Sequence, residues 1–146
     1  MQKLQFNRLI KEGFNHIPLS REIVVDTLTP LALYLKLANN PYSYFLESVQ
    51  GGEKWGRYSF IGLAAETVIK VNNYQVQVEK NGKLTQDYSV EDPLAWIEEY
   101  QNQYKVPQLD SLPDFNGGLV GYFGYEIVRY IEPKLAHINK TDELNV

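Results

Sequence analysis

The chain has 146 residues, no cysteine and a formal net charge of −4 at neutral pH. With 44% hydrophobic and 22% charged residues, it has the composition of a soluble globular protein that is long enough to bury a core. The lack of cysteine excludes disulfides and thiolate metal sites, and the acidic balance disfavours a nucleic-acid surface, which would be basic.

Further classes are disfavoured by single features of the sequence. His16 and His137 lie far apart, so a histidine-based metal site is not expected. No stretch approaches ~18 consecutive apolar residues, and the charged start has no apolar signal segment. We therefore expect one domain over residues 1–146, in the cytoplasm, without a membrane or nucleic-acid partner.

The first predicted elements are a helix and a strand. Residues 5–12 have apolar side chains at helical spacing, and Gly13 suits the C-terminal cap. Residues 17–26 contain the apolar run Ile23-Val24-Val25, which predicts a buried strand.

A second helix is predicted to begin at Thr29 and Pro30. Threonine caps helix N-termini, and proline at the first position lacks only a hydrogen that the helix does not use. The helix should run to about Ala38, before Asn39-Asn40-Pro41. Its apolar stripe consists of Leu31, Tyr34, Leu35, Leu37 and Ala38.

Five strands are predicted next, at residues 42–49, 57–63, 67–71, 74–79 and 83–89. The turns between paired strands are expected at Gly51-Gly52, Asn72-Asn73 and Asn81-Gly82. In the fourth strand, Val76 and Val78 occupy one face, and Gln75 and Gln77 occupy the other.

Helical and glycine-rich segments follow. Asp92 and Pro93 begin a third helix, whose expected inner face consists of Leu94, Trp96, Ile97, Tyr100 and Tyr104. Residues 119–125 predict a strand and residues 126–131 a short helix. The glycines of residues 117–124 do not have dinucleotide-binding spacing, so we interpret them as a packing element. A strand-rich middle between helices predicts an α+β fold with an antiparallel sheet.

The first predicted hairpin carries the most chemistry. Glu47 and Ser48 interrupt an apolar strand, and Arg57 begins the returning one. A carboxylate, a hydroxyl and a guanidinium around one hairpin suit a small zwitterionic ligand such as an amino acid. Because successive strand residues face opposite sides, Glu47 and Ser48 cannot both point at one ligand unless the strand twists or bulges. Taken alone, Ser48 is better explained as an ordinary strand serine on a solvated face.

Three blocks of the sequence resemble a known family. Residues 45–62 read FLESVQGGEKWGRYSFIG, and this run resembles the N-terminal region of anthranilate synthase component I. There the first element is usually Leu-Leu-Glu-Ser and forms part of the tryptophan feedback site; here Phe45 replaces the first leucine. Residues 17–39 and 117–126 (GGLVGYFGYE) are also similar to the family. The family's long C-terminal chorismate-binding domain has no counterpart among the 146 residues.

The resemblance implies site residues for tryptophan. Ser48 is the favoured direct side-chain contact, and Glu47 would then contribute through its backbone. Arg57 pairs either with the ligand carboxylate or with Glu47. Pro30 and Leu46 would wall the indole, although each alone is better explained as a helix start or as core.

The resemblance also implies the activity of the intact enzyme. It would convert chorismate, with ammonia or glutamine, to anthranilate and pyruvate. Magnesium would be bound by the missing C-terminal domain, and ammonia would come from a glutamine amidotransferase subunit (component II). The fragment alone is expected to bind no cofactor and to be non-catalytic, because it shows no acid/base constellation. Two alternatives remain: the N-terminal region of aminodeoxychorismate synthase component I, and a stand-alone amino-acid-binding module.

Overall fold

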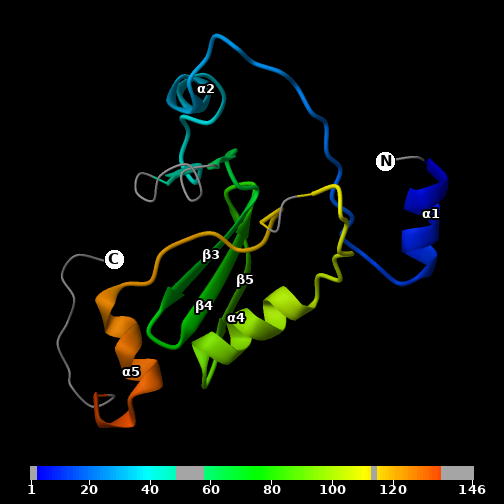
Figure 1. Cartoon of the computed structure of the whole chain (residues 1–146). Coiled ribbons are helices and arrows are strands. Elements are labelled where there is room, and N and C mark those ends of the chain that lie inside the picture. Colours follow the sequence, from blue (N-terminus) through cyan, green and yellow to red (C-terminus); the bar gives the residue numbers. More distant parts are fainter. Residues whose placement is uncertain (1–2, 49–57, 113–114, 136–146) are drawn as a thin grey trace. The chain divides into compact units, whose positions relative to one another are not determined.

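The computed structural model describes residues 3–48, 58–112 and 115–135 (Figure 1). The chain divides into two compact units, Met1–Arg21 with Val90–Val146, and Glu22–Ser89. Helices and two small antiparallel sheets make up the described residues, so the predicted α+β class is confirmed.

The first unit begins with helix α1 (Lys3–Lys11). Gly13 has φ +92°, and its N–H donates to the carbonyl of Ile10 at 3.0 Å. The N–H of Phe14 donates to the carbonyl of Leu9 at 3.2 Å. This pair of bonds is the Schellman arrangement, which satisfies carbonyls at a helix end and favours glycine at the left-handed position. The predicted cap at Gly13 is confirmed.

Helix α4 (Pro93–Asn102) belongs to the same unit. The Asp92 carboxylate accepts from the N–H groups of Leu94 and Ala95, at 2.9 and 3.1 Å, which confirms the predicted cap. Along the helix, Tyr100 is buried and its ring stacks on Trp96, with centroids 5.2 Å apart. The predicted apolar face is therefore the one that this helix packs.

An asparagine joins the two ends of the first unit. The Asn15 side chain donates to the carbonyl of Gln103 and accepts from the N–H of Lys105, both at 2.7 Å. The ring of His16 meets the ring of Tyr104 edge-on, with centroids 5.3 Å apart. Residues that follow α1 are thereby fixed to the end of α4.

The second unit begins with helix α2 (Pro30–Leu37), capped by Thr29, whose Oγ1 accepts from the N–H of Ala32 at 3.2 Å. The predicted stripe is only partly inside. Ala38 is buried and Tyr34 half-buried, whereas Leu31, Leu35 and Leu37 remain 51–63% exposed. Within the described residues, most of this stripe is therefore surface rather than core.

Two strands follow α2 as an antiparallel pair, β1 (Tyr44–Glu47) and β2 (Ser59–Gly62). The pairing confirms the predicted hairpin. Its expected turn at Gly51-Gly52 lies outside the described residues.

A three-stranded antiparallel sheet completes the second unit, with β3 (Thr67–Asn72), β4 (Gln75–Lys80) and β5 (Lys83–Ser89) in that order (green in Figure 1). Val76 and Val78 are 0% and 1% exposed, as their shared face predicts. On the opposite face, the amides of Gln75 and Gln77 donate to the two carboxylate oxygens of Asp87 at 2.8 and 3.0 Å. The sheet thus has one apolar and one polar face.

The two turns of this sheet differ in how well the sequence located them. Asn81 and Gly82 have φ +50° and +71°, which confirms the predicted two-residue turn. The β3–β4 turn falls on Asn73 and Tyr74 rather than on Asn72-Asn73, because Asn72 pairs with Gln75 in the ladder.

Two predicted strands were wrong. Residues 17–26 form no strand, and Ile23, Val24 and Val25 are 68%, 81% and 42% exposed. Residues 119–124 are likewise irregular. A strand needs a neighbouring backbone to pair its N–H and C=O groups, and the described residues offer none here. Immediately before residues 119–124, Gly117 and Gly118 have φ values of +154° and +132°, outside the range of a regular strand.

The short helix predicted at residues 126–131 is confirmed. A 3₁₀ turn η1 (Tyr125–Ile127) leads into α5 (Val128–Ile131), and a second turn η2 (Pro133–Leu135) follows. Arg129 and Glu126 form an ion pair across this segment.

Candidate functional site

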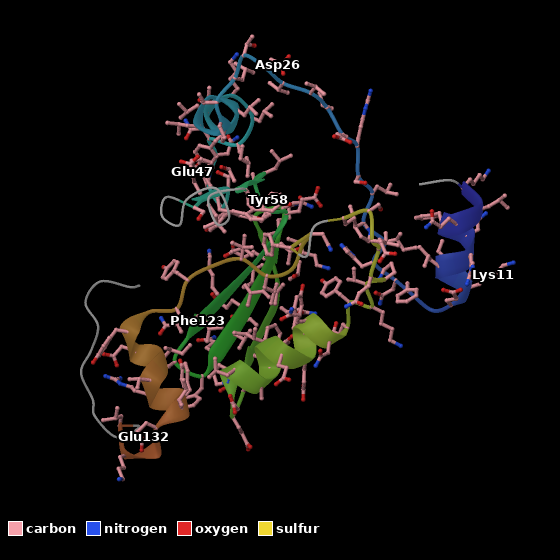
Figure 2. All side chains as sticks on the ribbon, viewed as in Figure 1. Lys11, Asp26, Glu47, Tyr58, Phe123 and Glu132 are labelled. Atoms are coloured by element: carbon pink, nitrogen blue, oxygen red, sulfur yellow. The ribbon has the colours of Figure 1, made fainter. Side chains whose placement is uncertain are left out.

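The β1–β2 hairpin brings a carboxylate and a hydroxyl together. Glu47 ends β1 and Ser59 begins β2, and the two residues are direct partners in the ladder. The Ser59 hydroxyl donates to Oε1 of Glu47 at 3.2 Å. Figure 2 shows Glu47 on one strand of the hairpin and Tyr58 immediately before the other.

The register divides the hairpin into two faces. Strand alternation places Phe45 and Glu47 on one face, and the pairs Phe45–Ile61 and Glu47–Ser59 complete it. The other face carries the pairs Tyr44–Gly62 and Leu46–Phe60. Glu47 and Ser59 are therefore the polar pair on a face whose other described hairpin residues, Phe45 and Ile61, are apolar.

Helix α2 packs on the Glu47 face. The ring of Tyr34 stacks on Phe45, with centroids 5.6 Å apart and an interplanar angle of 23°. The Tyr34 hydroxyl lies 3.3 Å from Oγ of Ser43, which in turn donates to the carbonyl of Asn40 at 2.7 Å. One tyrosine thus joins the helix, the connecting loop and β1.

The candidate ligand residues divide between the two faces. Pro30 begins α2 one turn before Tyr34, on the helix that covers the Glu47 face, and it is exposed. Leu46 points to the opposite face and is 47% exposed, so it is not core. Ser48 follows β1 and is exposed. Arg57 lies outside the described residues.

A second set of contacts ties the hairpin to β3. Tyr42 precedes β1 with φ +59°, and its carbonyl accepts from the N–H of Ala65 at 3.1 Å. Nζ of Lys70 lies 5.7 Å from the centroid of the Tyr42 ring and 2.6 Å from Oε1 of Glu79. The hydrogen bond to Glu79, and then that to Tyr42, raises the pKa of Lys70 above its ordinary value.

Sequence reasoning did not single out Ser59 or Tyr34 as parts of the site. Tyr34 was expected only as one member of the α2 stripe. Ser59 becomes the partner of Glu47 only once the strand register is known, because the register decides which residue lies opposite. An Arg-Tyr-Ser sequence at the start of the returning strand was the available signal.

Two surveys of the described residues bear on the kind of site. Residues 3–48, 58–112 and 115–135 contain no group of three or more histidine, aspartate or glutamate side chains that could hold a metal ion. No helix in those same ranges is long and apolar enough to cross a membrane.

The fold and the hairpin together define an α+β protein whose candidate site suits a small, charged organic ligand. Anthranilate synthase component 1 of Pseudomonas putida is 52% identical over 146 residues, which is 100% of this chain and 30% of that protein. The protein of the same name from Pseudomonas aeruginosa is 53% identical over 144 residues, 99% of this chain and 29% of that protein. Anthranilate synthase component 1 of Aquifex aeolicus is 40% identical over 127 residues, which is 86% of this chain and 26% of that protein.

These matches confirm the resemblance to anthranilate synthase component I, and they fall in the N-terminal region of those proteins. The chain spans about 30% of the length of these two Pseudomonas relatives. No protein-family model and no solved structure matches the chain.

Proposed function

We propose that this chain is the N-terminal, tryptophan-sensing region of an anthranilate synthase component I. The observation that carries the proposal is the 52% identity along all 146 residues to a protein of that name. In that role the intact enzyme is a lyase that converts chorismate and ammonia to anthranilate and pyruvate.

The parts of the enzyme that perform the chemistry belong, on this proposal, to the sequence that the relatives have beyond the match. Magnesium and the acid/base groups would be bound there, as the family resemblance implies. The name of the two Pseudomonas relatives, component 1, also supports a second component in the complex. That partner would be a glutamine amidotransferase subunit that supplies ammonia.

The hairpin supports the regulatory part of the proposal. An amino acid presents an ammonium, a carboxylate and a side chain, and the exposed Glu47 carboxylate suits the ammonium. The Ser48 hydroxyl, beyond the last ladder pair of β1, is the proposed direct contact, with Pro30 beside the indole and Arg57 near the ligand carboxylate. Leu46, which the sequence also suggested for the indole wall, lies on the opposite face of the hairpin and is not part of this wall. A small-ligand site encloses most of its ligand. Since Pro30 and Ser48 are exposed, the remaining wall would come from the rest of the protein.

A chimera tests the proposal. The matching N-terminal region of the Pseudomonas putida protein is replaced by this chain, which aligns with it over all 146 residues. The purified chimera is incubated with chorismate, magnesium and ammonia, and anthranilate is followed by its fluorescence while tryptophan is titrated. The unmodified Pseudomonas putida protein, assayed alongside, is the control.

We expect anthranilate formation that tryptophan inhibits. A folded chimera that makes no anthranilate, while the control does, would contradict the enzymatic part. An active chimera that ignores tryptophan would contradict the regulatory part.

A further inference from the structure

The hydrogen bond between Ser59 and Glu47 joins two side chains whose backbones are held opposite each other by the hairpin. The residues are direct cross-strand partners, and the Ser59 hydroxyl donates to Oε1 at 3.2 Å. Side chains at such positions have Cβ atoms about 5 Å apart because the ladder fixes their backbones. The orientation of the carboxylate is therefore linked to the register of the sheet.

The bond occupies only part of the carboxylate. An ionised glutamate has two oxygens with about four acceptor positions, and the serine uses one of them. Oε2 and the remaining position on Oε1 stay available to an ammonium group, which carries three donors. Ser59 is neutral, so it orients the carboxylate without competing for the positive charge of a ligand.

The surroundings restrict what else can orient Glu47. On the same face of the hairpin, the described neighbours Phe45 and Ile61 are apolar, and Phe45 is covered by the ring of Tyr34. Ser59 is thus the described hairpin residue on this face that offers a hydroxyl. A free glutamate loses rotamer freedom when it binds a ligand, and a side chain that is already held loses less.

We propose that Ser59 is a positioning residue: it holds the Glu47 carboxylate in the orientation that receives the ammonium group of bound tryptophan. This inference rests on the proposed function, since it deepens the regulatory site described there. Ser59 acts through Glu47, and its contribution therefore disappears when the Glu47 charge is removed.

The test uses the full-length chimera and a matched pair of variants. Ser59→Thr and Ser59→Val have nearly the same shape and both suit a strand, but only threonine keeps the hydroxyl. The dissociation constant for tryptophan is measured by titration calorimetry for both variants, for Glu47→Gln, and for the double variants. Circular dichroism of each protein verifies folding.

We expect Ser59→Val to bind tryptophan about 2- to 12-fold more weakly, the range for one net hydrogen bond. Ser59→Thr should recover most of that affinity. When Glu47→Gln is also present, the Ser59→Thr and Ser59→Val proteins should bind tryptophan with equal affinity. The reason is that the contributions of residues that act through one another are not additive.

Three outcomes would overturn the inference. If Ser59→Thr and Ser59→Val bind tryptophan equally well while Glu47 is unchanged, the hydroxyl has no role. If the two Ser59 variants still differ in tryptophan affinity when Glu47→Gln is also present, Ser59 acts independently of the carboxylate. If the chimera with unchanged Ser59 binds no tryptophan, the proposed regulatory function fails, and the inference fails with it. The first two outcomes leave the proposed function intact.

Discussion

The ring of Tyr44 lies directly over Gly62, its partner across the β1–β2 hairpin. A Cβ added at Gly62 would stand 2.0 Å from Cε1 of that ring, far inside van der Waals contact. The glycine is therefore required by the close approach of an aromatic side chain, an arrangement in which the ring covers the backbone that glycine leaves open.

Gly62→Ala is expected to destabilise the protein. The ring of Tyr44 must move or the strands must separate, and overpacking of this kind costs about 1–3 kcal/mol. Urea unfolding followed by circular dichroism measures the change. Gly121→Ala is the matched control, because nothing lies within 4 Å of a Cβ at that position. Equal stability of the two variants would contradict the close contact.

Asp92→Ala is expected to weaken helix α4. The carboxylate accepts from two N–H groups of the first turn, and loss of such a cap costs about 0.5–2 kcal/mol. Asp92→Asn keeps an acceptor oxygen, so it should retain most of the stability. Thermal unfolding of the three proteins checks the order, and an alanine variant as stable as the aspartate protein would show that the cap contributes nothing.

Ser48→Phe is expected to relieve tryptophan inhibition in the full-length chimera. The change removes a hydroxyl and adds a ring at the proposed ligand contact. Loss of one hydrogen bond to a charged group corresponds to about 10- to 150-fold in affinity. The measurement is the tryptophan concentration that halves anthranilate formation. An unchanged inhibition curve would place the site elsewhere, and a collapse of turnover at zero tryptophan would assign Ser48 a structural role.

The 146-residue chain alone is expected not to convert chorismate. Neither its sequence nor its described residues show an acid/base or metal constellation. The purified chain is incubated with chorismate, magnesium and ammonia, and anthranilate fluorescence is followed. The full-length chimera is the positive control, and turnover by the isolated chain above a blank without protein would show that catalytic groups had been overlooked.

Local signals in the sequence predicted helix starts and one turn well. Thr29 and Asp92 each cap a helix whose first residue is proline, and Asn81-Gly82 forms its turn, because these choices depend on a few adjacent residues. The strand predicted at Ile23-Val24-Val25 was wrong because a strand depends on more than adjacent residues. Its β-branched residues favour a strand, but a strand exists only where another backbone pairs with it.

The candidate site was predictable up to the alternation of its residues. The placement of Leu46 and Glu47 on opposite faces of β1 follows from the period of a strand. Strand periodicity does not predict which face of the hairpin α2 covers. That choice depends on the stacking of Tyr34 on Phe45, a contact between two elements. The pairing of Glu47 with Ser59 depends on the strand register, which the composition of the two strands alone does not determine.

The contacts of Asn15 have a consequence for the order of folding. Its partners Gln103 and Lys105 lie 88 and 90 residues further along the chain. In the sequence, the whole unit Glu22–Ser89 lies between Asn15 and these partners, and the hairpins of that unit join strands that are close in sequence. During synthesis on the ribosome, that unit is complete before Gln103 and Lys105 have been added. Since local contacts form faster than distant ones, the unit Glu22–Ser89 folds first, and Asn15 forms its bonds with Gln103 and Lys105 afterwards.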